Sequence, residues 1–221
     1  MGSTIDLKAA DGHTLSAYSA GPANGTKGVV VIQEIFGVNH HMRDMADRFA
    51  AEGYAVVAPA LFDRVERGVE LGYTADDIAK GRDYRMKLSD AQVMADVEAA
   101  AKHLAGKQLA IVGYCFGGTV AWWGATRTRL FAASSCWYGG GITGTKDETP
   151  HCPVQMHFGE TDTSIPMTDV DAIRAAQSKV EVHVYQGAGH GFGCNERGSY
   201  SKPDYEQAQK RTLDFFARHL G

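Results

Sequence analysis

One short stretch constrains this chain more than any other, Gly113-Tyr114-Cys115-Phe116-Gly117. An apolar run at residues 109–112 precedes it and is fit for a buried strand, and helix-compatible spacing follows it. A strand, a sharp turn and a helix, with a reactive side chain between two glycines, form the layout of a nucleophile elbow. The glycines are needed because a Cβ at the flanking positions of so tight a turn would collide with neighbouring backbone.

This pattern predicts Cys115 as a nucleophile, at the position where serine is usual. The turn lifts the side chain above the strand ends and sets it at a helix N-terminus. There the helix dipole and the N–H groups favour a thiolate. The same five residues are also compatible with a Gly-rich turn around a buried structural cysteine. The rest of the chain has to decide between these two interpretations.

Length and composition limit the class of protein. The 221 residues suit a single domain, residues 1–221, and 44% hydrophobic with 22% charged residues is ordinary for a globular protein. A net charge of −4 indicates no nucleic-acid or membrane partner. No apolar run approaches bilayer length, the N-terminus lacks a signal-peptide pattern, and the four cysteines fit no zinc spacing. We expect a cytoplasmic protein with reduced thiols.

Strand-like and helix-like segments alternate along the chain. A hairpin is expected over Ile5–Ser19, with a two-residue turn at Asp11-Gly12. Further strands are expected at residues 28–33, 54–58, 109–112, 131–137, 153–158 and 180–185. Helices are expected at residues 40–52, after a cap at Thr74, after a cap at Ser89, after the elbow, at 169–178 and at 203–219. This alternation predicts an α/β fold, a mostly parallel sheet with helices on both faces and an active site beyond the carboxyl ends of its strands.

Three loops that follow strands carry groups suited to one reaction, Cys115, Asp162 and His190. Nucleophile, acid and histidine follow one another in the chain order of α/β-hydrolases. His190 would take the thiol proton and return it to the leaving group, and Asp162 would hold the imidazole tautomer. Taken singly, the acid and the histidine are ordinary turn residues, but order and placement together favour a triad. The backbone N–H groups of Phe116 and Ile35 are the expected oxyanion-hole donors.

The sequence resembles the dienelactone hydrolase (carboxymethylenebutenolidase) family. The resemblance rests on Gln33–Asn39, Gly113–Gly118, Asp162 and Gly189–Phe192, and it covers nearly the whole chain. It implies an α/β-hydrolase fold, a cysteine nucleophile and the opening of enol-lactones with no metal or other cofactor. It further implies that Glu34 contacts the resting thiol and takes part in activating it. The alternative for Glu34 is a strand-end glutamate paired with a nearby arginine.

The chain departs from the family where the substrate carboxylate would bind. Family members that accept dienelactone hold this group with two arginines, one in the helical stretch before the elbow and one just after the catalytic histidine. Here Arg82 and Arg85 precede the elbow without matching that spacing. Cys194 stands four residues after His190, and Arg197 comes three residues later. The candidate substrate-binding residues are Arg82, Tyr84, Arg85, Tyr138 and Arg197, with Tyr138 equally compatible with a place in the core.

These observations predict a cysteine-dependent hydrolase of small enol-lactones or esters, active as a monomer or a homodimer. A peptidase or amidase with the same triad is one alternative, which the short cap region disfavours. A thiol redox protein is the other, and an exposed Cys194 near His190 would be open to oxidation. An acyl adduct on Cys115 separates the hydrolase from the redox protein.

Overall fold

The structure is a computed structural model that describes residues 2–221. The chain divides into two compact units, the first ending at Leu109 and the second running over Ala110–Gly221. The single domain expected from the length stays a prediction. Within the described residues, no helix combines the length and the apolar character needed to cross a bilayer.

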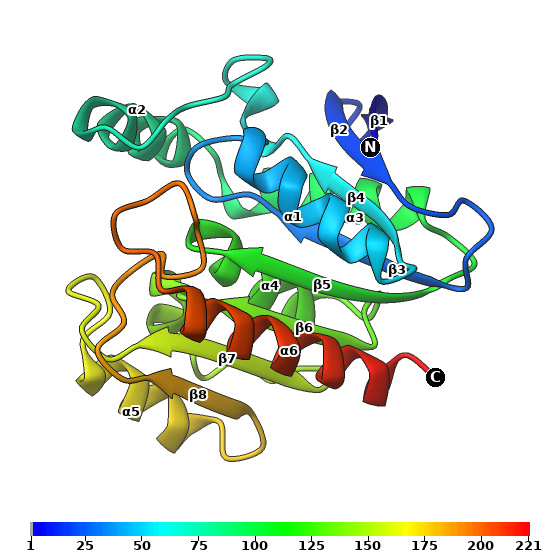
Figure 1. Ribbon diagram of the computed structural model, residues 1–221. Coiled ribbons are helices and arrows are strands. Elements are labelled where there is room, and N and C mark those ends of the chain that lie inside the picture. The colour runs from blue at the N-terminus through cyan, green and yellow to red at the C-terminus, as the bar shows by residue number, and fades with distance from the viewer. Residues whose placement is uncertain (1) are drawn as a thin grey trace. The chain divides into compact units, whose positions relative to one another are not determined.

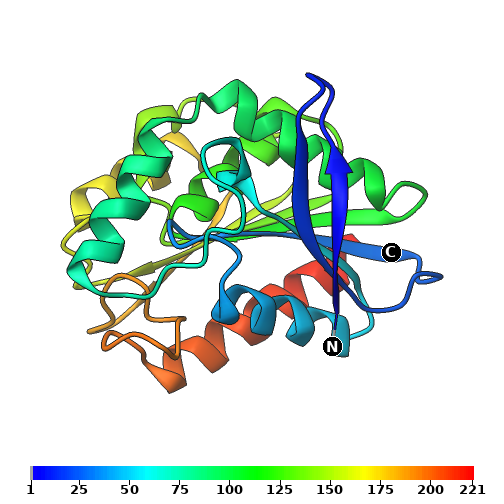
Figure 2. The ribbon, with the colours of Figure 1, turned by 90° about the horizontal axis from the view of Figure 1, so that it is seen from above.

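The first unit pairs its strands in the order β1-β2-β4-β3. The pairs β1–β2 and β2–β4 are antiparallel, whereas β3 and β4 run parallel. Helices α1 and α3 lie on opposite sides of these strands (Figure 2). The strands are β1 (Ser3–Lys8), β2 (Thr14–Ala20), β3 (Lys27–Ile32) and β4 (Ala55–Pro59), and the helices are α1 (His40–Ala51), the 3₁₀ turn η1 (Leu61–Arg64), α2 (Ala75–Met86) and α3 (Asp90–His103).

The sequence explains these elements of the first unit. Residues 29–32 of β3 are fully buried, as expected for an apolar β-branched run covered on both faces. Helix α1 buries Met42, Met45 and Phe49 along one stripe, with the predicted helical period. The predicted caps at Thr74 and Ser89 are confirmed, because both begin a helix with a complete capping box.

The hairpin is confirmed, but the prediction of its two-residue turn at Asp11-Gly12 is wrong. The strand register ends with the pair Lys8 and Thr14, and the N–H of Ala9 then donates to the carbonyl of His13 at 2.9 Å, so three residues, 10–12, form the tip of the loop. The carboxylate of Asp11 accepts a hydrogen bond from the N–H of His13 and pairs with Arg64 of η1 at 2.7 Å. An arginine far away in the sequence thus holds the loop, and no pattern within the hairpin predicts this contact.

The second unit pairs its strands in the order β5-β6-β7-β8, and every pair is parallel. Strand β5 (Gln108–Tyr114) starts at the boundary between the units. Helices α4 and α6 cover opposite faces of these strands (Figure 1). The other elements are α4 (Phe116–Arg127), β6 (Ala133–Trp137), the 3₁₀ turn η2 (Gly140–Thr145), β7 (Val154–Gly159), α5 (Met167–Ala176), β8 (Glu181–Tyr185) and α6 (Lys202–His219). Parallel pairing brings the carboxyl ends of these strands, and the loops that follow them, to one edge.

Candidate active site

The nucleophile elbow has the local geometry that its sequence predicts. Strand β5 ends at Tyr114 and α4 begins at Phe116, which leaves Cys115 as the single residue between them. Cys115 has φ 55° and ψ −117°, a backbone conformation that is strained for any residue with a Cβ. A Cβ on Gly113 would fall on the backbone of Gly117, which confirms the steric reason for glycine at that position.

Hydrogen bonds join the three predicted triad side chains into one chain. The Nε2 atom of His190 lies 3.2 Å from the Sγ atom of Cys115, which is hydrogen-bond distance for sulfur. On its other side, the Nδ1–H group of His190 donates to Oδ2 of Asp162 over 2.7 Å. The second oxygen of Asp162 accepts from the backbone N–H of Ser164 at 2.8 Å, so the carboxylate is oriented as well.

The loops that carry Asp162 and His190 are tied to each other. The backbone N–H and the hydroxyl of Thr161 both donate to the carbonyl of Ala188. A Cβ on Gly159 would collide with this carbonyl, so glycine is what permits the close approach. Thr161 directly precedes Asp162, and Ala188 lies two residues before His190. These hydrogen bonds therefore fix the position of the Asp162 side chain relative to that of His190.

The surroundings of His190 favour a charged imidazole. Burial alone lowers the pKa of His190, but hydrogen bonds to Asp162 and Cys115 more than offset it and raise the pKa to about 10. This raised pKa favours the imidazolium form of the ring at neutral pH. An imidazolium at 3.2 Å, together with the N-terminus of α4, is able to stabilise negative charge on the sulfur.

The two predicted oxyanion donors belong to different units. Phe116 is the first residue of α4 and directly follows Cys115, which is the position of the oxyanion donor in an elbow of this kind. Ile35 follows β3 in the first unit and is partly exposed. Its part in an oxyanion hole stays a prediction.

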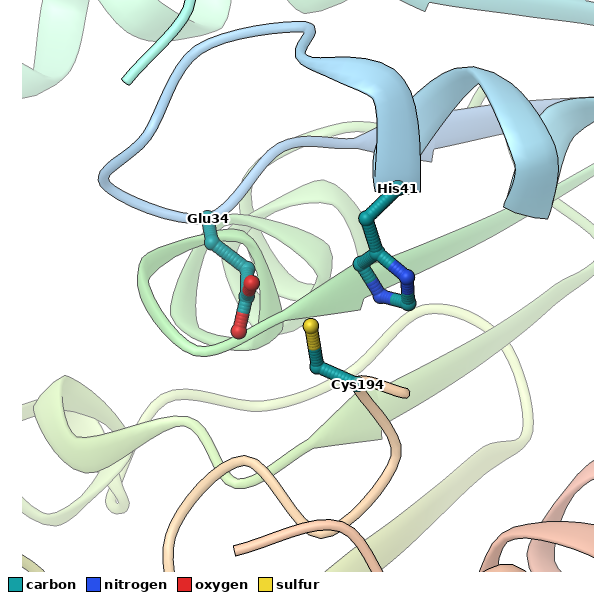
Figure 3. Close-up of side chains that lie close together, drawn as sticks. All are labelled: Glu34, His41 and Cys194. Atoms are coloured by element: carbon teal, nitrogen blue, oxygen red, sulfur yellow. The ribbon is translucent and has the colours of Figure 1, made fainter. Parts of the chain in front are cut away.

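Glu34 is a buried carboxylate next to a buried histidine of the same unit. It is 1% exposed and follows β3, and His41, in the first turn of α1, is also 1% exposed. A carboxylate oxygen of Glu34 and a ring nitrogen of His41 lie within 4.8 Å of each other (Figure 3). Sequence reasoning missed His41 as a neighbour of Glu34, because the loop between them bends back by an amount that spacing does not reveal.

The candidate substrate-binding residues of α2 have different surroundings. Tyr84 is buried, and its hydroxyl donates to Glu66. Arg85 donates to the carbonyl of Leu88 and pairs with Asp90, so its guanidinium supports the turn between α2 and α3. Arg82 is exposed on α2.

Two candidates of the second unit lie beside the loop that carries His190. The Tyr138 and His190 rings meet edge to face, with 5.3 Å between their centroids. The guanidinium of Arg197 lies against Gly191, the residue after His190, where a Cβ would come within 2.5 Å of Nη1. Cys194 is fully buried, so the exposed thiol considered from the sequence is not present.

Comparison with known proteins places the chain in a family. Residues 15–220 match the family model described as "Dienelactone hydrolase family". A Synechocystis protein named "Putative carboxymethylenebutenolidase" is 36% identical over 212 residues, covering 87% of this chain and 86% of that protein. An Escherichia coli protein of the same name is 34% identical over 233 residues, covering 95% and 84%.

Solved structures give the same result for the fold. The crystal structure of a protein described as "Putative Dienelactone Hydrolase" from Klebsiella pneumoniae has a TM-score of 0.85, with 30% identity, and covers 99% of both chains. The Pyrococcus furiosus esterase Pf2001 has a TM-score of 0.75 at 16% identity, covering 100% of this chain and 93% of the other, and shows the fold alone. The chain therefore has the α/β-hydrolase fold, belongs to the dienelactone hydrolase family and is a hydrolase of carboxylic esters or lactones.

Proposed function

We propose that this protein opens small enol-lactones or esters with Cys115 as the nucleophile, His190 as acid and base, and Asp162 as the group that orients the histidine. The observation that carries the proposal is the hydrogen-bonded chain from the thiol through the imidazole to the carboxylate, at 3.2 and 2.7 Å. It begins at a strained elbow, where the protein holds a cysteine in a conformation that costs stability. The cytoplasm as location, and a monomer or homodimer as the active form, stay predictions.

The reaction follows from these positions in two steps. Cys115 gives its proton to Glu34 and attacks the carbonyl carbon as a thiolate, and the resulting oxyanion accepts hydrogen bonds from the N–H groups proposed for it, those of Phe116 and Ile35. The carbon–oxygen bond of the ester then breaks, and the His190 imidazolium gives its proton to the departing oxygen. Neutral His190 next takes a proton from water, whose oxygen attacks the thioester. The carbon–sulfur bond then breaks, the acid product leaves, and the released thiolate takes its proton back from Glu34, while His190 is again an imidazolium.

Glu34 adds control over the thiol in this proposal. A buried carboxylate close to a thiol disfavours the thiolate, because two negative charges at short range repel each other. Its burial at 1% exposure supports such a role, since a carboxylate in a dry environment interacts strongly with nearby charge. Substrate would displace the carboxylate, which could then accept the thiol proton.

Arg197 is the arginine we favour for a substrate carboxylate. It lies against Gly191, directly after the proposed acid–base His190, whereas Arg85 lies at the turn between α2 and α3, where it bonds Leu88 and Asp90. A guanidinium near the reacting bond pairs well with a carboxylate in a bidentate arrangement. Tyr84 is the weakest candidate, because its hydroxyl already donates to Glu66.

The test is to trap the acyl-enzyme. The protein is mixed with p-nitrophenyl acetate, the burst of nitrophenolate is followed, and the intact mass is measured before turnover is complete. We expect one added acetyl group, located on Cys115 by peptide mapping. Cys152→Ala is the matched control, because Cys152 is another partly exposed thiol of the same unit and its loss should leave the burst unchanged.

Two results would contradict the proposal. Hydrolysis with no acetyl group on Cys115 would remove the cysteine from the reaction. Absence of ester hydrolysis, combined with reversible peroxide oxidation of Cys115, would favour the thiol redox protein instead.

A further inference from the structure

Tyr138, directly after β6, has an unusual backbone. Among the described residues other than glycine, only Cys115 and Tyr138 have a positive φ, 55° and 37°. Such a conformation costs stability for a residue with a large side chain and persists only where the surroundings impose it. One of these two residues is the proposed nucleophile, which raises the question of what the other one does.

The peptide unit before Tyr138 is held from both sides. The carbonyl of Trp137 accepts a hydrogen bond from the N–H of Cys115 at 3.0 Å, and the N–H of Tyr138 donates to the carbonyl of His157 at 2.8 Å. One peptide unit thus joins the elbow to β7. The chain then passes α4 so closely that a Cβ on Gly139 would meet the helix backbone at 2.7 Å. Because the peptide unit before Tyr138 and the glycine after it are both fixed, the chain changes direction at Tyr138, through its positive φ.

The side chain of Tyr138 is fully buried and packs against the catalytic loop. Its ring lies edge to face with His190, 5.3 Å between centroids, and with Phe192, 5.5 Å between centroids. Phe192 in turn stacks on Trp137 at 5.7 Å. The imidazole therefore has an aromatic wall beside it, in addition to its two hydrogen-bond partners.

Trp137 is fixed from the side of α6. Its indole N–H donates to the hydroxyl of Thr212 in α6, and this hydroxyl also bonds Ser135 of β6 and the ring of the fully buried His157. Burial lowers the pKa of His157 well below its usual value, so this cluster stays neutral and keeps its hydrogen bonds. These hydrogen bonds fix Trp137, the residue that directly precedes the strained Tyr138.

We propose that Tyr138 is a positioning residue: its ring holds the His190 imidazole in the one orientation that reaches both Cys115 and Asp162. The proposal rests on the function proposed above for Cys115 and His190. Edge-to-face contacts between aromatic rings have a preferred geometry and add to the packing energy, so the ring restricts rotation of the imidazole. The strained φ of Tyr138 is the cost of presenting the ring there.

The first test compares Tyr138→Leu with Tyr138→Phe. Leucine would fill space without a ring, so we expect kcat for p-nitrophenyl acetate to fall by about tenfold or more with KM little changed, since misplacing a catalytic group lowers the rate of reaction. The NMR titration of His190 should move to lower pH, because looser contacts to Cys115 and Asp162 raise its pKa less. Tyr138→Phe keeps the ring, so its loss in both measurements should be much smaller than that of Tyr138→Leu.

A second pair of variants tests the same contact without removing the ring. A Cβ on Gly193 would meet the Tyr138 hydroxyl at 3.1 Å and the Trp137 ring at 3.0 Å. Gly193→Ala should therefore push the tyrosine and lower kcat, and adding Tyr138→Phe should restore part of the loss by removing the hydroxyl. Gly198→Ala is the matched control in the same loop, because a Cβ there meets open space.

The proposal fails if folded Tyr138→Leu keeps both kcat and the His190 titration of the wild type. Should that variant not fold, the Gly193 pair decides, and no recovery in the double variant would overturn the proposal. These outcomes are distinguishable from failure of the proposed function. If the wild type hydrolyses no ester, the His190 titration and the alkylation rate of Cys115 still report whether Tyr138 positions the imidazole.

Discussion

Two turns in this protein each lead from a buried strand into a helix, and they are built in opposite ways. Between β3 and α1 the positive φ falls on Gly37, at 80°, and Asn39 caps the helix by accepting a hydrogen bond from the N–H of Met42. Between β5 and α4 the positive φ falls on Cys115, and no side chain caps the helix. The first turn follows the local rules for stability, whereas the second one breaks two of them.

The difference shows where stability has been exchanged for reactivity. A cap and a glycine together are worth roughly 1 to 3 kcal/mol at such a turn. The β5–α4 turn forgoes both, and what it obtains is a partly exposed sulfur at a helix N-terminus beside an imidazolium. Strain at a single residue without an evident structural benefit is typical of functional sites.

The largest expected effect tests the second turn. Cys115→Ala should reduce kcat for p-nitrophenyl acetate by about 10⁵-fold or more, because the reacting atom itself is lost. Asn39→Ala, in the first turn, should leave kcat unchanged. Steady-state kinetics on both folded variants measure the contrast. Substantial activity in Cys115→Ala, with contaminants excluded, would show that Cys115 is not the nucleophile.

Asp162→Asn should reduce kcat by about 10³- to 10⁴-fold, less than loss of the nucleophile, because it disturbs the orientation of His190 and removes no reacting atom. The pKa of His190 should fall, since the carboxylate is one of the two groups that raise it. NMR titration of the imidazole checks this. A His190 titration that is unchanged in Asp162→Asn would show that the hydrogen bond at 2.7 Å does not set the charge of the ring.

The same shift predicts a pH dependence of stability. The pKa of His190 is raised from 6.5 to about 10, so its contribution to the free energy of unfolding is fully present below pH 6.5 and is lost as the pH rises through about 10. Urea unfolding measures the free energy of unfolding of the wild type and of Asp162→Asn across this range. The difference in free energy between the two proteins should become smaller as the pH rises. A difference in free energy that does not change with pH would contradict the raised pKa of His190.

Glu34 is the functional candidate in the otherwise conventional first turn. Glu34→Gln should lower kcat by about 10- to 100-fold, near the lower end of what a proton acceptor contributes. It should also make resting Cys115 more reactive toward iodoacetamide, because the repelling charge is gone. The pH profile of alkylation in both proteins is the measurement. Unchanged alkylation and unchanged kcat would leave Glu34 as a structural strand-end residue.

Arg197→Ala should raise KM for a carboxylate-bearing ester by about tenfold, the value of a hydrogen bond to a charged group, with little change for a neutral ester. Arg129→Ala is the matched control, because Arg129 is an exposed arginine of the same unit that has no place in the proposed site. Equal effects of Arg197→Ala on anionic and neutral esters would exclude a carboxylate clamp at this residue.

The smallest effects are in stability, and they compare the two turns directly. Asn39→Ala should cost about 1 kcal/mol through loss of the cap. Cys115→Gly should instead raise the free energy of unfolding by about 1 kcal/mol, because glycine adopts the positive φ without strain. Chemical denaturation measures both, and a destabilised Cys115→Gly would show that the elbow is not under strain.

Local sequence determined much of this protein. Some features depend only on residues within a few positions of one another, and the local sequence pattern predicts them. These are the capping boxes at Thr74 and Ser89, the buried run of β3 and the glycine-flanked Cys115. The order of Cys115, Asp162 and His190 along the chain also predicted which loops meet, because parallel strands bring their carboxyl ends to one edge.

Tertiary structure decided what depends on distant partners. Arg64 pairs with Asp11 in the hairpin loop, packing buries Cys194, and the ring of Tyr138, whose φ is strained, lies against His190. The partners in the first and last of these contacts are far apart in the sequence, and the loop that carries Cys194 is folded by its surroundings. No local period or propensity encodes such contacts, because their energy exists only once the chain has brought the partners together.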